Sequence, residues 1–231
     1  MYRSILATLL ASTIVIQITM AAEPTIVERT TDKPAAGSEM PMTVQQVSDR
    51  LYELGAQKVL ILDGELSYVN LNSSRFDDRR VNLLQGHSNL VYLSLTKTRI
   101  SDAALDVVGQ LKSLRWLLLS QTDITDAGVA KLSALSNLQT LTLRSTRISD
   151  QALESVSHLP SLRTLVIGDT NISDAGIQSL VAMKHLSILH LEGTKITESG
   201  LQRLRREMPQ CEIIGTSTID GQTAAEVPNH G

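Results

Sequence analysis

The sequence predicts an α/β solenoid, in which a parallel sheet forms one face and helices form the other. Leucine occupies 35 of the 231 positions, whereas Phe and Trp occur once each. Apolar residues recur with a strict period of 24 residues, and each period changes from strand-like to helix-like spacing. A lattice of one residue type at a fixed period indicates that a single packing arrangement is repeated along the chain.

The period occurs six times. The first leucines of the repeats are Leu66, Leu90, Leu114, Leu138, Leu162 and Leu186. Counted from these leucines, positions 1, 4 and 6 are apolar, and positions 4 and 6 share one face of a strand. Position 11 is also apolar, and apolar positions 16 and 19 share one face of a helix. Each unit is therefore predicted to be a short strand, a turn, a helix of about two turns and a return segment.

A single unit cannot cover its own leucines, so neighbouring units must stack with their strands about 4.8 Å apart. We expect a curved, right-handed solenoid with the parallel sheet on its concave face and the helices on its convex face. Strand positions 2, 3, 5, 7 and 8 point outward and contribute nothing to this core. Core packing therefore does not constrain the residues at these positions, and they can be used to bind a partner.

The N-terminal residues resemble an export signal. Residues 1–21 combine one positive charge, an apolar run and small residues before Ala22, which indicates a cleaved signal peptide or an uncleaved anchor. Residues 22–42 are polar and lack apolar periodicity, so we expect a flexible linker. Residues 43–65 predict a capping helix that opens at Thr43, followed by a hairpin with Asp63-Gly64 as its turn.

The six repeats fill residues 66–209. A closing strand is expected at 210–215, arriving one residue late relative to the period and directing Cys211 inward as a small buried hydrophobe. Residues 216–231 have the polar character of a disordered tail.

Two charged columns are expected to build the scaffold. An acid at position 13 follows a Ser, Thr or Asp that can cap a helix, and acids stabilise that end of the helix dipole. A basic residue precedes several of these acids by three positions, which indicates local ion pairs. The basic column is Arg75, Arg99, Arg147 and Lys195.

At this point the sequence resembles the leucine-rich repeat family, of the ribonuclease-inhibitor-like type. The run Ile124-Thr125-Asp126-Ala127-Gly128-Val129 is similar to the Ile-Thr-Asp-x-Gly-Leu signature of the cysteine-containing subclass. That subclass carries Cys or Asn at position 9, where this chain has Thr or Ser. The resemblance covers residues 43–215 and extends to bacterial exported proteins. It implies a protein-binding scaffold, with the position 9 hydroxyls in a buried hydrogen-bonding ladder.

The candidate binding residues lie on the outward strand positions. Tyr68, Tyr92 and Trp116 occupy position 3 of consecutive repeats, and Leu118 lies beside Trp116 with its side chain expected to be exposed. Arg115, Arg144 and Arg163 flank this row. Tyr, Trp and Arg are the residues that anchor protein interfaces. The alternative, that the rings only stabilise neighbouring strands, remains open.

Other classes of function find little support. A net charge of −3 argues against non-specific nucleic-acid binding. One cysteine excludes an intramolecular disulfide framework and any multi-cysteine metal site. No nucleophile or phosphate-loop motif is present, so we expect no catalytic residues and no cofactor. Asp169, His190 and Glu192 could converge on the concave face, but their spacing does not indicate a metal site.

The sequence therefore predicts an exported, non-enzymatic, monomeric scaffold that binds a protein partner in the periplasm, at the cell surface or after secretion. One alternative is a carbohydrate or cell-wall binder, because exposed aromatic rows can stack on sugar rings. A second alternative is a ubiquitin-ligase-type substrate adaptor, which the subclass resemblance implies and the export signal opposes. Membrane attachment is expected only if the N-terminal segment stays uncleaved.

Overall fold

The computed structural model describes residues 42–215, 218–219 and 222–223. The predicted signal peptide and, apart from Met42, the predicted linker lie outside these residues, as does most of the predicted tail. Within that tail, strand β9 (Thr218–Ile219) pairs antiparallel with strand β10 (Gln222–Thr223).

Helix α2 (Val44–Glu53) caps the solenoid at its N-terminal end. It begins where it does because Thr43 and Gln46 form a capping box. Thr43 Oγ1 accepts a hydrogen bond from Gln46 N at 3.2 Å, and Gln46 Oε1 accepts one from Thr43 N at 2.8 Å. Near the end of the helix, the Tyr52 hydroxyl accepts from Val59 N at 3.0 Å and donates to Val59 O at 3.3 Å. These bonds occupy backbone groups of the first strand, at the edge of the sheet.

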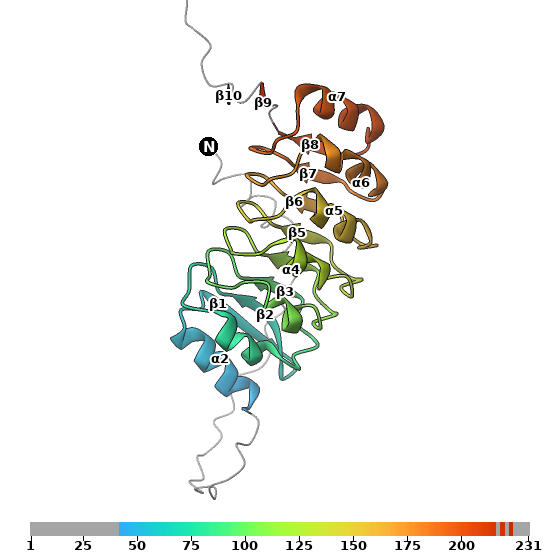
Figure 1. Ribbon diagram of the computed structural model, residues 1–231. Coiled ribbons are helices and arrows are strands. Elements are labelled where there is room, and N and C mark those ends of the chain that lie inside the picture. The colour runs from blue at the N-terminus through green and yellow to red at the C-terminus, as the bar shows by residue number, and fades with distance from the viewer. Residues whose placement is uncertain (1–41, 216–217, 220–221, 224–231) are drawn as a thin grey trace, which may run out of the picture. The chain divides into compact units, whose positions relative to one another are not determined.

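In the described part of the chain, eight strands form one sheet in the order β1 to β8 (Figure 1). Strands β1 (Lys58–Leu62) and β2 (Glu65–Asn70) form an antiparallel hairpin. Its turn residues, Asp63 and Gly64, have φ values of 51° and 78°, which a two-residue hairpin turn requires. The remaining strands are β3 (Tyr92–Ser94), β4 (Trp116–Leu118), β5 (Thr140–Thr142), β6 (Thr164–Val166), β7 (Ile188–His190) and β8 (Glu212–Ile214).

Strands β2 to β8 are parallel, and each residue pairs with the residue 24 positions later in the sequence. Strand β8 keeps this register, since Leu189 pairs with Ile213 and His190 pairs with Ile214. The expectation that the closing strand arrives one residue late is therefore wrong. Backbone pairing with β7 sets the register, and Ile213, rather than Ile214, joins the core column. Cys211 is buried just before the strand, and burial raises the pKa of its thiol.

Short helices follow the strands on the opposite side of the repeats (Figure 1). They are η1 (Asp78–Leu84), α3 (Leu105–Val108), α4 (Asp126–Ala130), α5 (Asp150–Ser157), η2 (Asp174–Gly176) with α6 (Ile177–Ala182), and α7 (Glu198–Glu207). Several are shorter than the expected two turns, and η1 and η2 are 3-10 helices. A 3-10 helix advances about 2.0 Å per residue, against 1.5 Å in an α-helix, so the three residues of η2 lengthen the helical segment that α6 continues.

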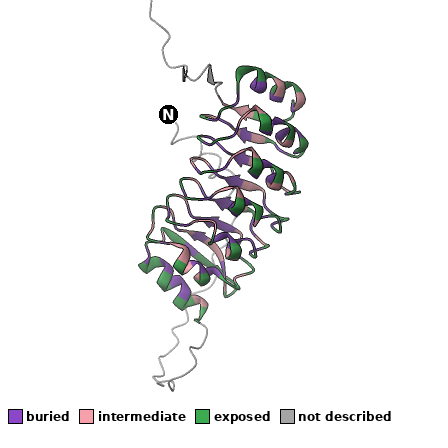
Figure 2. Cartoon of the chain, in the orientation of Figure 1, coloured by how far each residue is buried: buried purple, intermediate pink, exposed green. Residues whose placement is uncertain are grey.

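The core lies between the sheet and the inner faces of the helices, where Figure 2 shows buried chain in every repeat. Positions 1, 4 and 6 of the strands supply one side of this core. The helices supply the other side through positions 16 and 19, such as Val129 and Leu132. The core therefore runs along the whole solenoid as a stack of apolar layers, one from each repeat. Each layer is covered only by the layers of the neighbouring repeats.

The position 13 carboxylates join neighbouring repeats, which sequence reasoning did not foresee. Asp126 Oδ1 accepts from Ser149 N at 2.7 Å, and its Oδ2 accepts from the Ser149 hydroxyl at 2.6 Å. We call this pair of bonds the inter-repeat clamp. It recurs in Asp78–Ser101, Asp102–Thr125, Asp150–Ser173 and Asp174–Thr197.

The clamp corrects the expected ion pairs between positions 10 and 13. The position 13 acids accept hydrogen bonds from the next repeat. Arg147 Nη2 instead lies 2.7 Å from Oδ1 of Asp123, which occupies position 10 of the preceding repeat. The clamp also leaves no room for a side chain at position 128, because a Cβ on Gly128 would collide with the Asp102 carboxylate.

The position 9 hydroxyls do not form a ladder between repeats in the described residues. Thr98 Oγ1, for example, donates to Leu95 O within its own repeat at 2.6 Å. Thr122, Thr146 and Thr170 repeat this bond at 2.5–2.6 Å. Each hydroxyl therefore satisfies a carbonyl at the turn that follows its strand, because position 8 is left-handed there and bends the chain back.

Candidate partner-binding face

The outward side chains at strand positions 3 and 5, together with their neighbours on β1, form what we call the concave face. The parallel register places Tyr68 beside Tyr92 and Tyr92 beside Trp116. On the other side, Leu60 of β1 pairs with Tyr68. An apolar row therefore runs across four adjacent strands, from β1 to β4.

Two of the rings in this row pack on each other. The ring centroids of Tyr68 and Tyr92 lie 4.1 Å apart, and the ring planes differ by 7°. Lys58 Nζ lies 5.6 Å from the Tyr68 ring centroid, within the range of a cation–π contact. Burial raises the pKa of the Tyr92 hydroxyl above its ordinary value. Part of the aromatic row thus stabilises strand pairing, as the alternative interpretation of the sequence expected.

The exposure of the row differs from the expectation. Leu118 is only 7% exposed and Tyr92 only 6%, so the predicted exposure of Leu118 is wrong. Leu118 lies on a strand that is paired on both sides, in register with Ser94 and Thr142. Trp116 and Tyr68 are half-buried.

Sequence reasoning missed two leucines at the edge of this face. Leu60 is 39% exposed and Leu62 is 60% exposed. Both belong to the hairpin, which the sequence predicts only as a cap. The signal that could have found them is the antiparallel pairing around Asp63-Gly64, because it places Lys58 and Leu60 opposite Asn70 and Tyr68 of the first repeat.

The three candidate arginines lie apart. Arg115 lines a depression of about 360 Å³ at the margin where the strands begin, together with Leu62 and Asp63. Arg163 also precedes its strand, and its Nη1 donates to His185 O at 2.9 Å. Arg144 follows its strand, at the opposite margin. The structure therefore does not gather the predicted residues into a single cluster.

The concave face becomes charged toward its C-terminal end. Arg144 Nε lies 2.7 Å from Asp169 Oδ2, and Arg144 Nη1 lies 3.6 Å from Glu192 Oε2. His190 is half-buried beside this group, with Glu212 on the next strand. Among the described residues, no group of three or more His, Cys, Asp or Glu side chains is arranged to hold a metal ion.

The stability of this end should depend on pH through His190. Burial is the main cause that lowers the pKa of its imidazole below 6.5, and Arg144 adds to it, whereas Glu212 and Glu192 oppose it. The folded state then binds fewer protons than the unfolded state, so this contribution is present above pH 6.5 and is lost as the pH falls. In urea melts from pH 7 to pH 5, His190→Gln should lose less stability than the wild type. Identical pH dependence would contradict this assignment.

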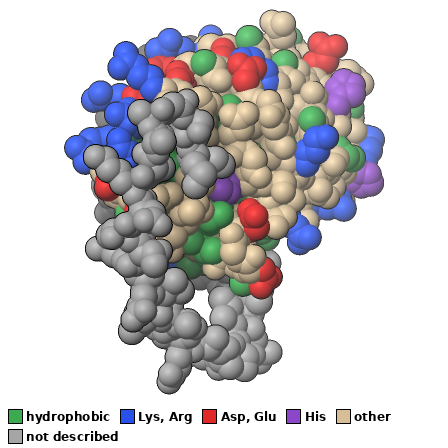
Figure 3. Space-filling model, turned by 90° about the horizontal axis from the view of Figure 1, so that it is seen from below, with side chains coloured by type: hydrophobic (Ala, Val, Ile, Leu, Met, Phe, Trp, Pro, Cys, Tyr) green, Lys and Arg blue, Asp and Glu red, His purple; other side chains and the backbone are tan. Residues whose placement is uncertain are grey.

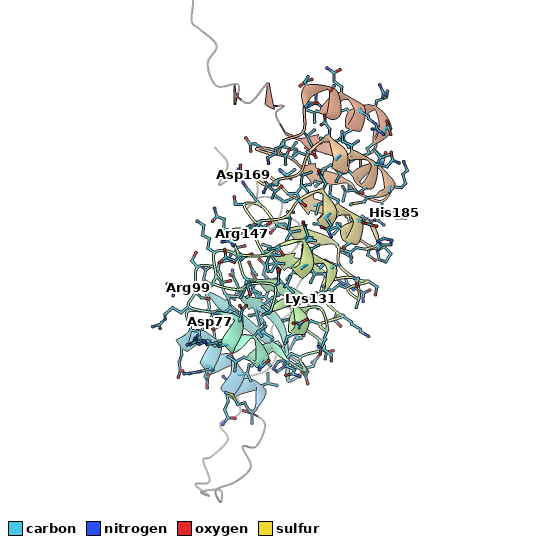
Figure 4. The ribbon with its side chains drawn as sticks, in the orientation of Figure 1. Asp77, Arg99, Lys131, Arg147, Asp169 and His185 are labelled. Carbon is cyan, nitrogen blue, oxygen red and sulfur yellow. The ribbon has the colours of Figure 1, made fainter. Side chains whose placement is uncertain are left out.

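Exposed charged side chains lie in the turns at the margin that follows the strands. Figure 4 shows Arg99, Arg147 and Asp169 along one side of the solenoid and Lys131 and His185 on the opposite side. Seen from below in Figure 3, blue Lys and Arg side chains gather on the same left margin. A depression of about 490 Å³ lies there, lined by residues of four consecutive turns that include Arg99, Asp123, Arg147 and Asp169.

Stacked strand–turn–helix units with a 24-residue register define a solenoid of α/β repeats. The family described as leucine rich repeat matches residues 136–196, which span two whole repeats and the start of a third. The matched part of the chain thus carries leucine-rich repeats, in agreement with the resemblance seen in the sequence.

Solved structures of this kind include two from Listeria monocytogenes. Internalin C2 is 22% identical to this chain, and the match covers 65% of this chain and 71% of that one with a TM-score of 0.48. The internalin InlF is 17% identical, and the match covers 76% of this chain and 56% of that one, also with a TM-score of 0.48. No curated protein matches the sequence significantly. Within the described residues, the helices are too short or too polar to cross a membrane.

Proposed function

We propose that this protein is an exported, non-enzymatic scaffold that binds a protein partner through its concave face. The observation that carries the proposal is the apolar row from β1 to β4, in which Leu60, Leu62 and Trp116 expose surface that the core does not need. Covering exposed leucine and tryptophan side chains with another protein removes them from water, which favours binding. Export rests on the sequence pattern of residues 1–21, and the site of action is then the periplasm, the cell surface or the medium.

The same row gives less support to a carbohydrate binder. Sugar rings stack on exposed aromatic faces, whereas Tyr68 and Tyr92 direct their faces at each other. Tyr92 is buried, and Tyr68 and Trp116 are each only half exposed. A protein partner can instead use the mixed surface of leucine side chains and ring edges.

Paired baits test the proposal. The full chain and a Leu60→Ser/Leu62→Ser/Trp116→Ala variant would be used to capture proteins from an envelope extract, with circular dichroism showing that both fold. A control variant, Lys131→Ala, changes the helical side of the solenoid (Figure 4). We expect the concave variant to lose a protein that the control retains. Identical captures from all three baits would overturn the proposal.

A further inference from the structure

The positive charges beside the apolar row lack carboxylate partners. Lys58 lies over the Tyr68 ring, and Lys97 and Arg99 are exposed in the turn directly after β3. Within the part of the chain that the structure describes, none of the three forms an ion pair. The N-terminal half of the face therefore combines exposed leucine and tryptophan with uncompensated positive charge.

The C-terminal half differs in part, because Arg144 and Arg147 have acidic partners there, whereas Arg163 and Lys195 are exposed and form no ion pair among the described residues. Arg144 lies between Asp169 and Glu192, and Arg147 pairs with Asp123. A charged partner gains little from cations that are already neutralised. What distinguishes the N-terminal half is that its unpaired cations lie beside the exposed leucines of β1.

Arg115 lies at the opposite margin of the strands, where Asp63 lines the same depression, so it is not counted among these cations. Arg99 shares its depression with Asp123, but the carboxylate of Asp123 pairs with Arg147. The attraction is confined to the β1–β3 side and the turns that follow it. Unpaired exposed charges raise the association rate of an oppositely charged partner, while desolvated apolar contacts hold it. Both kinds of group lie within the four adjacent strands β1 to β4 and their turns.

We propose that the N-terminal half of the concave face binds an acidic peptide segment in which Asp or Glu alternates with apolar side chains. The inference rests on the proposed function and specifies the partner's chemistry. The apolar side chains contact Leu60, Leu62 and Trp116, and the carboxylates face Lys58, Lys97 and Arg99. The C-terminal half contributes little to affinity.

Trp116 is the only tryptophan in the chain, so its fluorescence reports directly on this face. The full chain would be titrated with three synthetic peptides that lack Trp and share one set of apolar residues, interleaved with Glu, Lys or Ser. We expect the Glu peptide to shift the Trp116 emission and to bind at least tenfold more tightly than the Lys peptide. Its affinity should fall as salt is raised.

Charge reversal supplies the second measurement. Lys97→Glu/Arg99→Glu should weaken the Glu peptide at least tenfold and strengthen the Lys peptide. The matched control, Arg205→Glu/Arg206→Glu, makes the same charge change on exposed side chains of α7 and should leave both affinities unchanged. Equal affinities for the three peptides, or equal effects of the two reversals, would overturn the inference. Polyglutamate that binds without changing the Trp116 emission would overturn it as well.

The bait experiment separates this inference from the proposed function. A protein captured through Leu60, Leu62 and Trp116 but indifferent to Lys97→Glu/Arg99→Glu would refute the acidic partner and leave the binding face intact. Failure of the baits to distinguish the concave variant would refute the binding face itself.

Discussion

Replacing Leu117 with alanine should lower the free energy of unfolding by about 2–5 kcal/mol. Leu117 is fully buried and pairs in register with Leu93 and Leu141. The substitution removes three carbons and leaves a cavity in a central repeat. Because each repeat is covered only by its neighbours, the loss affects both interfaces of that layer. Urea unfolding followed by circular dichroism measures the change.

The control is the same substitution at Leu62, which is 60% exposed. Leu62→Ala should change the free energy of unfolding by less than about 0.5 kcal/mol, because little buried surface is lost. If both variants lost similar stability, the assignment of Leu117 to the core and Leu62 to the surface would be wrong.

Replacing Asp126 with alanine should cost about 2–3 kcal/mol of unfolding free energy. The change leaves the backbone N–H and the hydroxyl of Ser149 without their carboxylate acceptor. Hydrogen bonds to a charged group contribute about 1.5–3 kcal/mol each, and partial exposure of this pair reduces the sum. Asp126→Asn keeps one oxygen acceptor and should lose less than Asp126→Ala. Urea melts of both variants provide the measurement.

Asp106→Ala serves as the comparison for the clamp. Asp106 is an exposed acid whose carboxylate pairs with Lys131 at 2.8 Å, and such a surface pair contributes less than about 1 kcal/mol. Equal losses from Asp106→Ala and Asp126→Ala would mean that the clamp acts as an ordinary surface charge.

The fold class could be predicted because it depends on a period. Alternation at positions 4 and 6 and the spacing of positions 16 and 19 are local properties, and 24-residue repetition leaves stacking as the way to bury them. The register of β8 could not be predicted as well. The only guide there was the apolar spacing of Cys211 and Ile214, whereas backbone pairing with β7 decides the register.

The candidate face could be predicted only in part. The column of Tyr68, Tyr92 and Trp116 follows from the period, so the structure places them side by side. Side-chain exposure does not follow from a period, because it depends on what the neighbouring strands cover, as Leu118 shows. Ion pairing is equally non-local, since Arg144 meets acids from two later repeats.

The constant register between strands also determines how the length of this surface can change. Duplicating or deleting one 24-residue unit between two equivalent positions would preserve every pairing and every clamp on either side of the junction. The sheet would grow or shrink by one strand, about 4.8 Å, without disturbing the composition of the columns. The length of the face therefore changes only in steps of one repeat, through recombination within the gene. Its chemistry changes separately, through substitutions.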